Sequence, residues 1–121
     1  MRTSLTAAAL VILIAGGVLA QDQVYKIGNG VTSPVLTKEV KPNYTKGAMR
    51  RNVQGVVEVT AVVLTDGTVD HVKVIRSLDE ELDEQAVKAA RQWKFRPGTK
   101  DGQPVAVQVS IELTFTLRDK K

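Results

Sequence analysis

The side chains best suited to chemistry are few. His71 is the only histidine and the chain has no cysteine, so no cysteine-bound metal and no thiolate nucleophile can form. Ser77 lies outside any Gly-x-Ser-x-Gly motif and has no base near it in sequence, so we interpret it as a helix cap. We therefore predict neither catalysis nor a metal or cofactor, and we expect His71 to be a solvated side chain.

Two charged clusters could suggest ligands. The first holds five acids between residues 79 and 84, but it lacks the Asp-x-Asp-x-Asp-Gly pattern of a calcium loop. Acids at a helix start complement the helix dipole, so we interpret them that way. The second, Trp93-Lys94-Phe95-Arg96, mixes aromatic and basic side chains as a nucleic-acid site would. The helical spacing of Trp93 indicates a core residue instead. A net charge of only +4 is too small to predict a nucleic-acid partner.

The N-terminus has the pattern of a secretory signal peptide. Arg2 precedes an almost wholly apolar stretch, Leu5–Leu19, and Val18-Leu19-Ala20 fits a signal-peptidase site. The apolar stretch is shorter than the roughly 20 residues that span a bilayer, although a retained membrane anchor is the alternative. We predict a leader at residues 1–20, a linker at 21–41 and one domain at 42–118. Within the linker, Gly28-Asn29-Gly30 indicates a turn, and Val24, Tyr25 and Ile27 could add a short strand.

The domain is expected to alternate helices and strands. Asp66-Gly67 between two apolar runs is a strong hairpin signal. The second helix begins near Ser77, capped by Ser77 or by Asp79, and stops at Arg96-Pro97-Gly98. The other predicted elements are a helix from an Asn43 or Thr45 cap to about Asn52, a strand at Val56–Leu64, and a return strand at Val69–Arg76 with a bulge near Asp70-His71.

The last predicted strand is the element around which we expect the other strands and the helices to pack. From Val105 to Leu117 every odd position is apolar and every even one is small or polar, which is typical of a strand with one buried face. We predict an α+β fold: a three-stranded antiparallel sheet in the order second-first-third, with two helices on one face. The long strand then lies at an edge, where unpaired backbone groups can recruit another strand.

The domain resembles the TonB C-terminal domain family over about Pro42 to Leu117. The Trp-x-Phe-x-Pro block, at its proper distance from the Asp-Gly hairpin, is the most specific part of this resemblance. The residues that carry it are Pro42-Asn43-Tyr44, Gly55, Asp66-Gly67, Ser77, Leu82-Asp83, Ala86, Trp93-Lys94-Phe95-Arg96-Pro97-Gly98, Gly102 and Phe115.

The resemblance implies a periplasmic protein that binds the TonB box, a short extended peptide of outer-membrane receptors. In the family this peptide adds to the edge strand, and an ExbB/ExbD complex of the inner membrane supplies the energy for uptake. By position, the docking strand here is Val105–Leu113, and Lys41-Pro42-Asn43 lies near the receptor. The expected partner-binding residues are Lys41, Pro42, Asn43, Val105, Val107, Gln108, Val109, Ser110 and Ile111.

The chain departs from the family pattern at several points. It lacks a histidine-bearing anchor and a long proline-rich linker, Lys41 stands where the well-known member has Gln, and Thr45 replaces the usual Pro. Two other functions stay open from sequence. One is a self-associating module whose edge pairs with a second copy as a homodimer; the other is a TolA-like envelope protein without a transport role.

Overall fold

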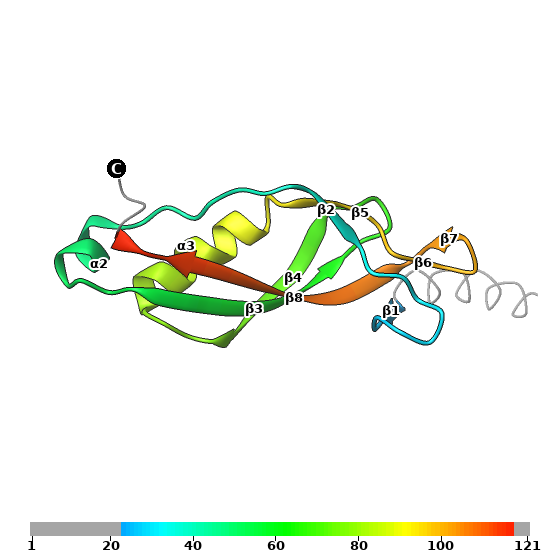
Figure 1. Cartoon of the computed structure of the whole chain (residues 1–121), viewed down its shortest axis with the longest axis horizontal. Helices are drawn as coiled ribbons and strands as arrows, with labels where there is room; N and C mark the ends of the chain where they lie inside the picture. The colour runs from blue at the N-terminus through cyan, green and yellow to red at the C-terminus, as the bar shows by residue number, and fades with distance from the viewer. Residues whose placement is uncertain (1–22, 118–121) are drawn as a thin grey trace, which may run out of the picture.

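The computed structural model describes residues 23–117, so the predicted leader lies outside the described residues (Figure 1). No helix within this range is long and apolar enough to cross a membrane. In chain order the elements are β1 (Val24–Tyr25), β2 (Val35–Lys38), α2 (Lys46–Arg50), β3 (Gly55–Val63), β4 (Val69–Arg76), α3 (Glu80–Ala90), β5 (Lys94–Arg96), β6 (Thr99–Lys100), β7 (Gln103–Pro104) and β8 (Ala106–Phe115).

The main sheet has the strand order β1-β8-β3-β4. β3 lies antiparallel to both neighbours, and its pairing with β8 is unbroken from Gly55 opposite Phe115 to Val63 opposite Val107. β3, β4 and β8 thus form the antiparallel sheet predicted from sequence, in the predicted order. A fourth strand, β1, forms at Val24–Tyr25, where the sequence indicated that a short strand could be added, and it pairs in parallel with β8 at Ala106 and Val107. The predicted three-stranded sheet did not include it.

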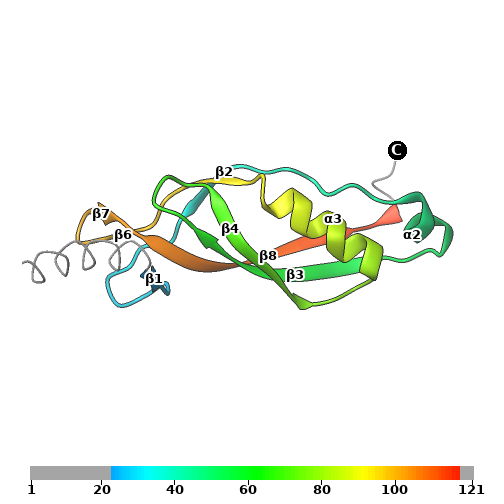
Figure 2. The same cartoon turned by 180° about the vertical axis from the view of Figure 1, so that it is seen from behind.

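One face of this sheet carries the core. Along β8 the odd positions Val107, Ile111, Leu113 and Phe115 are buried, while the even positions from 108 to 114 are exposed. The long helix α3 lies across the buried face (Figure 2) and contributes Leu82, Ala86, Ala89 and Ala90 to the same cluster. Ala48 of α2 joins this cluster, so the α+β fold with both helices on one face is confirmed.

The hairpin of β3 and β4 ends at Asp66-Gly67, as predicted. Its pairing shifts register between Thr60 and Val62, and His71 in β4 has a φ of 52°. The bulge expected near Asp70-His71 is therefore present. The backbone N–H of His71 donates to the Asp70 carboxylate at 2.8 Å, and the residue is exposed, in agreement with the solvated side chain that we predicted.

Both helix starts are clear in the structure. Thr45, not Asn43, caps α2 and accepts the Ala48 N–H at 3.1 Å. Asp79, the second of the two candidates, caps α3, whereas Ser77 donates to the Asp83 carboxylate. Helix α3 ends at Ala90, earlier than the predicted stop at Arg96-Pro97-Gly98.

The segment after α3 forms a strand that the sequence did not reveal. β5 pairs antiparallel with β2, which lies inside the segment expected to be a linker. This two-stranded ribbon places Leu36 opposite Phe95 and carries the chain toward α2. Residues 24–41 are thus largely built into the fold by β1, β2 and the Gly28–Val31 turn.

Asp79 also links the two helices electrostatically. Its carboxylate accepts the Glu81 and Leu82 N–H groups and pairs with Arg51 of the α2 C-cap at 2.6 Å. The hydrogen bond from Arg51 is the main cause that lowers the pKa of Asp79 below its usual value, and the bond from the Leu82 N–H acts in the same direction. A lowered folded-state pKa means that this stabilisation is present above the unfolded pKa, near 4, and is lost as pH falls through the folded value.

We therefore expect Asp79→Asn, which keeps one capping oxygen but removes the charge, to lower the melting temperature at pH 7 by only a few degrees. The effect is small because the Arg51 side chain is half exposed and solvent screens the pair. Thermal unfolding of the variant and the parent between pH 7 and pH 2 checks this. The two curves should converge below pH 4; a constant difference across this range would show that the carboxylate charge does not contribute.

Candidate functional site

The feature that stands out is the side of β8 that faces away from β3. Within residues 23–117 only β1 pairs with this side, and it reaches no further than Val107. In an antiparallel ladder, alternate residues direct their N–H and C=O groups away from the partner strand. Because no described strand pairs there between Gln108 and Phe115, this stretch presents a row of backbone donors and acceptors, and we call it the free edge.

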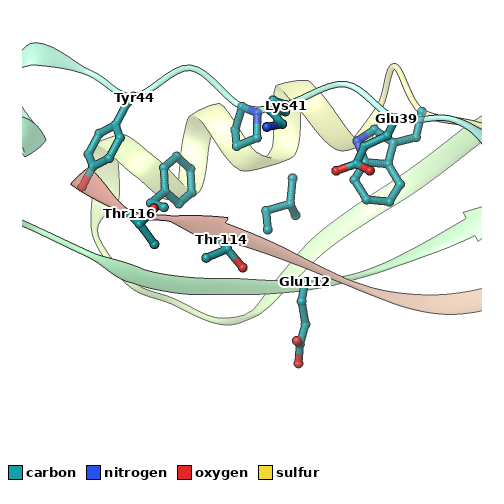
Figure 3. A pocket seen from close by; sticks show the side chains of 10 residues that line it. Glu39, Lys41, Tyr44, Glu112, Thr114 and Thr116 are labelled. Carbon is teal, nitrogen blue, oxygen red and sulfur yellow. The ribbon is translucent and has the colours of Figure 1, made fainter. Parts of the chain in front are cut away.

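Two cavities run along the free edge, and we call them together the edge groove. The first, of about 310 Å³, lies at the C-terminal end of β8 (Figure 3). It is lined by Glu39, Lys41, Pro42, Tyr44, Trp93, Glu112, Leu113, Thr114, Phe115 and Thr116. The second, of about 340 Å³, is lined by Ile27, Ser33, Pro34, Trp93, Phe95, Val109, Ser110, Ile111 and Glu112. The cavities share Trp93 and Glu112, so they follow one another along the strand.

The outer wall of the first cavity is the segment 39–44, which runs roughly alongside β8. Trp93 holds this wall from α3's end, because its Nε1–H donates to the Val40 carbonyl at 2.8 Å. At the other end the Tyr44 hydroxyl donates to the Val53 carbonyl. The Tyr44 ring packs edge-on against Phe115, with 5.5 Å between ring centroids. Contacts between residues that are 53 and 71 positions apart in sequence thus hold the outer wall beside β8.

The second cavity has an aromatic floor. The Phe95 ring lies 6.2 Å from the Trp93 ring. The Phe95 N–H donates to the Gly67 carbonyl at 2.9 Å, which ties β5 to the tip of the β3–β4 hairpin. The floor is therefore positioned by the hairpin that the Asp-Gly motif forms.

The charged residues of the groove lie on its walls and are not buried. Within residues 23–117 no charged or polar residue is buried. Glu39 and Lys41 lie on the outer wall, and Figure 3 shows the Glu112 side chain pointing away from the cavity. No group of His, Asp and Glu among these residues could hold a metal ion. The site offers backbone hydrogen bonds along β8, a mixed polar and aromatic lining in the first cavity and a mainly apolar one in the second, which suit an extended peptide better than a small charged ligand.

Comparison with known proteins identifies the fold. The family described as the Gram-negative bacterial TonB protein C-terminal matches residues 40–117. The chain belongs to this TonB C-terminal family.

Individual relatives agree. Protein TonB of Xanthomonas campestris pv. campestris (strain B100) is 36% identical over 90 residues, which cover 73% of this chain and 40% of that protein. Protein TonB of Vibrio cholerae is 34% identical over 89 residues, which cover 72% of this chain and 36% of that protein. The chain therefore spans well under half the length of these relatives. The solution structure of the Pseudomonas aeruginosa TonB C-terminal domain superposes with a TM-score of 0.59, covers 79% of this chain and 96% of that domain, and is 23% identical.

The structure brings most of the predicted TonB-type binding residues to the groove. Lys41 and Pro42 line the first cavity, and Val109, Ser110 and Ile111 line the second. Gln108 is exposed at the start of the free edge.

The remaining three predicted residues lie elsewhere. Asn43 lines a further cavity beside Gln85 and Lys88, on the side of Lys41 and Pro42 that faces α3. Val105 precedes β8, and its N–H donates to the Gly98 carbonyl at 2.9 Å. Val107 is fully buried and paired with Tyr25 of β1.

Sequence reasoning missed the aromatic lining. It assigned Trp93 to the core, where it does lie, but not to the groove that its exposed rim borders. Tyr44, Phe95 and Phe115 were not proposed as binding residues either. The alternation that continues past Leu113 to Phe115 was the available signal, since it extends the edge strand beyond the predicted docking segment.

Proposed function

We propose that this chain binds the extended TonB-box segment of an outer-membrane receptor by strand addition to β8. The observation that carries the proposal is the free edge from Gln108 to Phe115, which opens onto the edge groove with its aromatic and apolar side chains in the second cavity. A partner strand there would extend the sheet by one strand and satisfy the backbone groups that β8 leaves unpaired.

The groove also favours particular partner side chains. Successive side chains of an added strand point to opposite faces of the sheet, so every second one would enter the groove. There it would meet Trp93, Phe95 and Tyr44, which suit small or branched apolar residues. The other side chains would lie on the exposed face beside Ser110, Glu112 and Thr114.

The cellular role that we propose is that of a periplasmic TonB-like component of energy-coupled transport. Family membership supports this role, and the leader predicted at residues 1–20 fits export to the periplasm or, in the alternative, anchoring at the inner membrane. Partners of the ExbB/ExbD type would then supply the energy. The same free edge could pair with a second copy of the chain, and sedimentation of the isolated protein distinguishes this homodimer from a monomer that awaits a receptor peptide.

A pair of peptides tests strand addition without altering the protein. One carries the box sequence of a receptor from the same cell, and the other replaces its central residue with proline. We expect the proline peptide to bind at least about tenfold more weakly, because proline removes a ladder donor and fits poorly into a sheet. Isothermal titration gives both affinities.

Amide hydrogen exchange shows where the peptide binds. Saturation with the unaltered peptide should slow exchange at alternate residues of Gln108–Phe115 and leave the opposite sheet edge, β4, unchanged. Equal affinity of the two peptides, or protection confined to β4, would contradict strand addition at β8.

A further inference from the structure

The N-terminal strand β1 occupies the same side of β8 that the partner would use. It pairs with Ala106 and Val107, directly before the free edge begins at Gln108 (Figures 1 and 2). The pairing is parallel, and the next residues, Lys26 and Ile27, follow β8 toward the groove. Ile27 lines the second cavity together with Val109 and Ile111, so this N-terminal segment reaches into the edge groove itself.

The attachment of β1 is slight. It makes two residue pairs, Val24 with Ala106 and Tyr25 with Val107. Val24 is 45% exposed and Ile27 is 50% exposed, although both are apolar. The Tyr25 ring is half buried, and the Lys100 ammonium lies 5.7 Å from its centre. Segments held by few buried contacts are those that open locally while the rest of a fold stays intact.

A firm anchor lies just after β1. Val31 is buried and forms a bridge with Lys100, and Thr32 exchanges hydrogen bonds with Thr99. Between β1 and this anchor, Gly28 and Gly30 both have positive φ, with open space around the Cβ position. Residues 24–27 can therefore leave β8 by rotation at the glycine turn, while the chain from Val31 onward keeps its contacts.

We propose that Val24–Ile27 is a built-in competitor for the edge of β8, which a receptor peptide displaces when it binds. This inference rests on the proposed function of the same edge. While β1 is bound, a partner strand is confined to the part of the edge beyond Ile27. Release of β1 extends the available edge to Ala106 and clears the second cavity, so it raises peptide affinity.

A reversible lock tests the competition within one molecule. The chain has no cysteine, so Val24→Cys combined with Ala106→Cys creates a single pair at positions that face each other across the ladder. We expect the oxidised full-length protein to bind the box peptide at least tenfold more weakly than the same protein after reduction. Equal affinity of the two forms would overturn the proposal.

A second pair of variants covers the case in which the disulfide fails to form. Tyr25→Ala removes the half-buried ring of β1, whereas Gln23→Ala changes an exposed neighbour. Tyr25→Ala should increase peptide affinity several-fold, whereas Gln23→Ala should leave it unchanged. An affinity of Tyr25→Ala that is equal to or lower than that of the parent would count against a competing strand.

Hydrogen exchange separates this inference from the proposed function. If no form binds the peptide, the proposed function fails, and the exchange rates of the β1 amides decide whether β1 detaches. Rates at Val24 and Tyr25 near those of the exposed turn at Asn29 support a detachable strand. Rates as slow as those of Val57 and Val59 in β3 show a fixed strand and overturn it.

Discussion

Gly67→Ala is expected to lower the free energy of unfolding by about 3 kcal/mol or more. Gly67 lies at the hairpin tip with a φ of 88°, a conformation that non-glycine residues rarely adopt. A Cβ at this position would also lie 2.0 Å from the Phe95 carbonyl oxygen, a backbone atom that cannot rotate away. The substitution must therefore push the hairpin and β5 apart and break the bond from the Phe95 N–H to the Gly67 carbonyl.

Gly102→Ala is the matched control, because an alanine there would have the same unfavourable positive φ but its Cβ would not collide with another atom. Its φ is 80°, and no atom lies within 4 Å of the Cβ position. It should cost about 1 kcal/mol, the usual penalty for positive φ at an alanine. Urea denaturation of both variants measures the difference. Similar values for the two would mean that the hairpin tip does not press against β5 in solution.

The effect should extend to the candidate site. Phe95 forms the floor of the second cavity, and its strand is held partly by the Gly67 carbonyl. The Asp-Gly motif, which the sequence analysis identified as a hairpin signal, thus also supports the edge groove. A motif predicts its own turn from local chemistry, but it says nothing about the backbone that the turn will contact 28 residues later.

Elements whose signal lies within their own segment were predicted from the sequence, and elements that depend on a distant partner were not. β8 and the β3–β4 hairpin were predictable because alternation and turn chemistry are contained within each segment. β2 was not, since all four of its residues are exposed and its partner β5 begins 56 residues after Lys38. β5 itself follows the apolar stripe of α3, and Trp93 continues that stripe in sequence, so the helix was predicted to extend too far.

The binding edge was predictable in outline only. The alternation from Val105 identified the strand, and the family resemblance assigned it to docking. The cover over Ala106 and Val107 comes from a two-residue parallel strand that lies some 80 residues earlier in the sequence. Two residues carry no usable periodicity, so only the structure distinguishes the covered part of the edge from the free part.

Trp93→Phe is expected to weaken peptide binding at least tenfold while it lowers the free energy of unfolding by only about 1 kcal/mol. Phenylalanine keeps most of the buried ring but lacks the N–H that donates to the Val40 carbonyl. Val40 directly follows Glu39 and precedes Lys41, which both line the first cavity, so the loss of this bond frees the outer wall of the groove. A partner strand would then have to order the wall as it binds, and that ordering reduces affinity.

Two further variants distinguish the contribution of Trp93 to peptide binding from its contribution to folding stability. Trp93→Ala empties a buried site and should cost about 3–5 kcal/mol, so any binding it loses reflects folding as well as the wall. Gln92→Ala removes an exposed neighbour that bonds only within its own helix turn, to the Lys88 carbonyl, and should preserve both stability and affinity. Titration with the box peptide and urea denaturation give both quantities for each protein. If Trp93→Phe binds the peptide as the parent does, the segment 39–44 is no part of the binding surface, and the free edge of β8 must recognise its partner through backbone bonds and the second cavity alone.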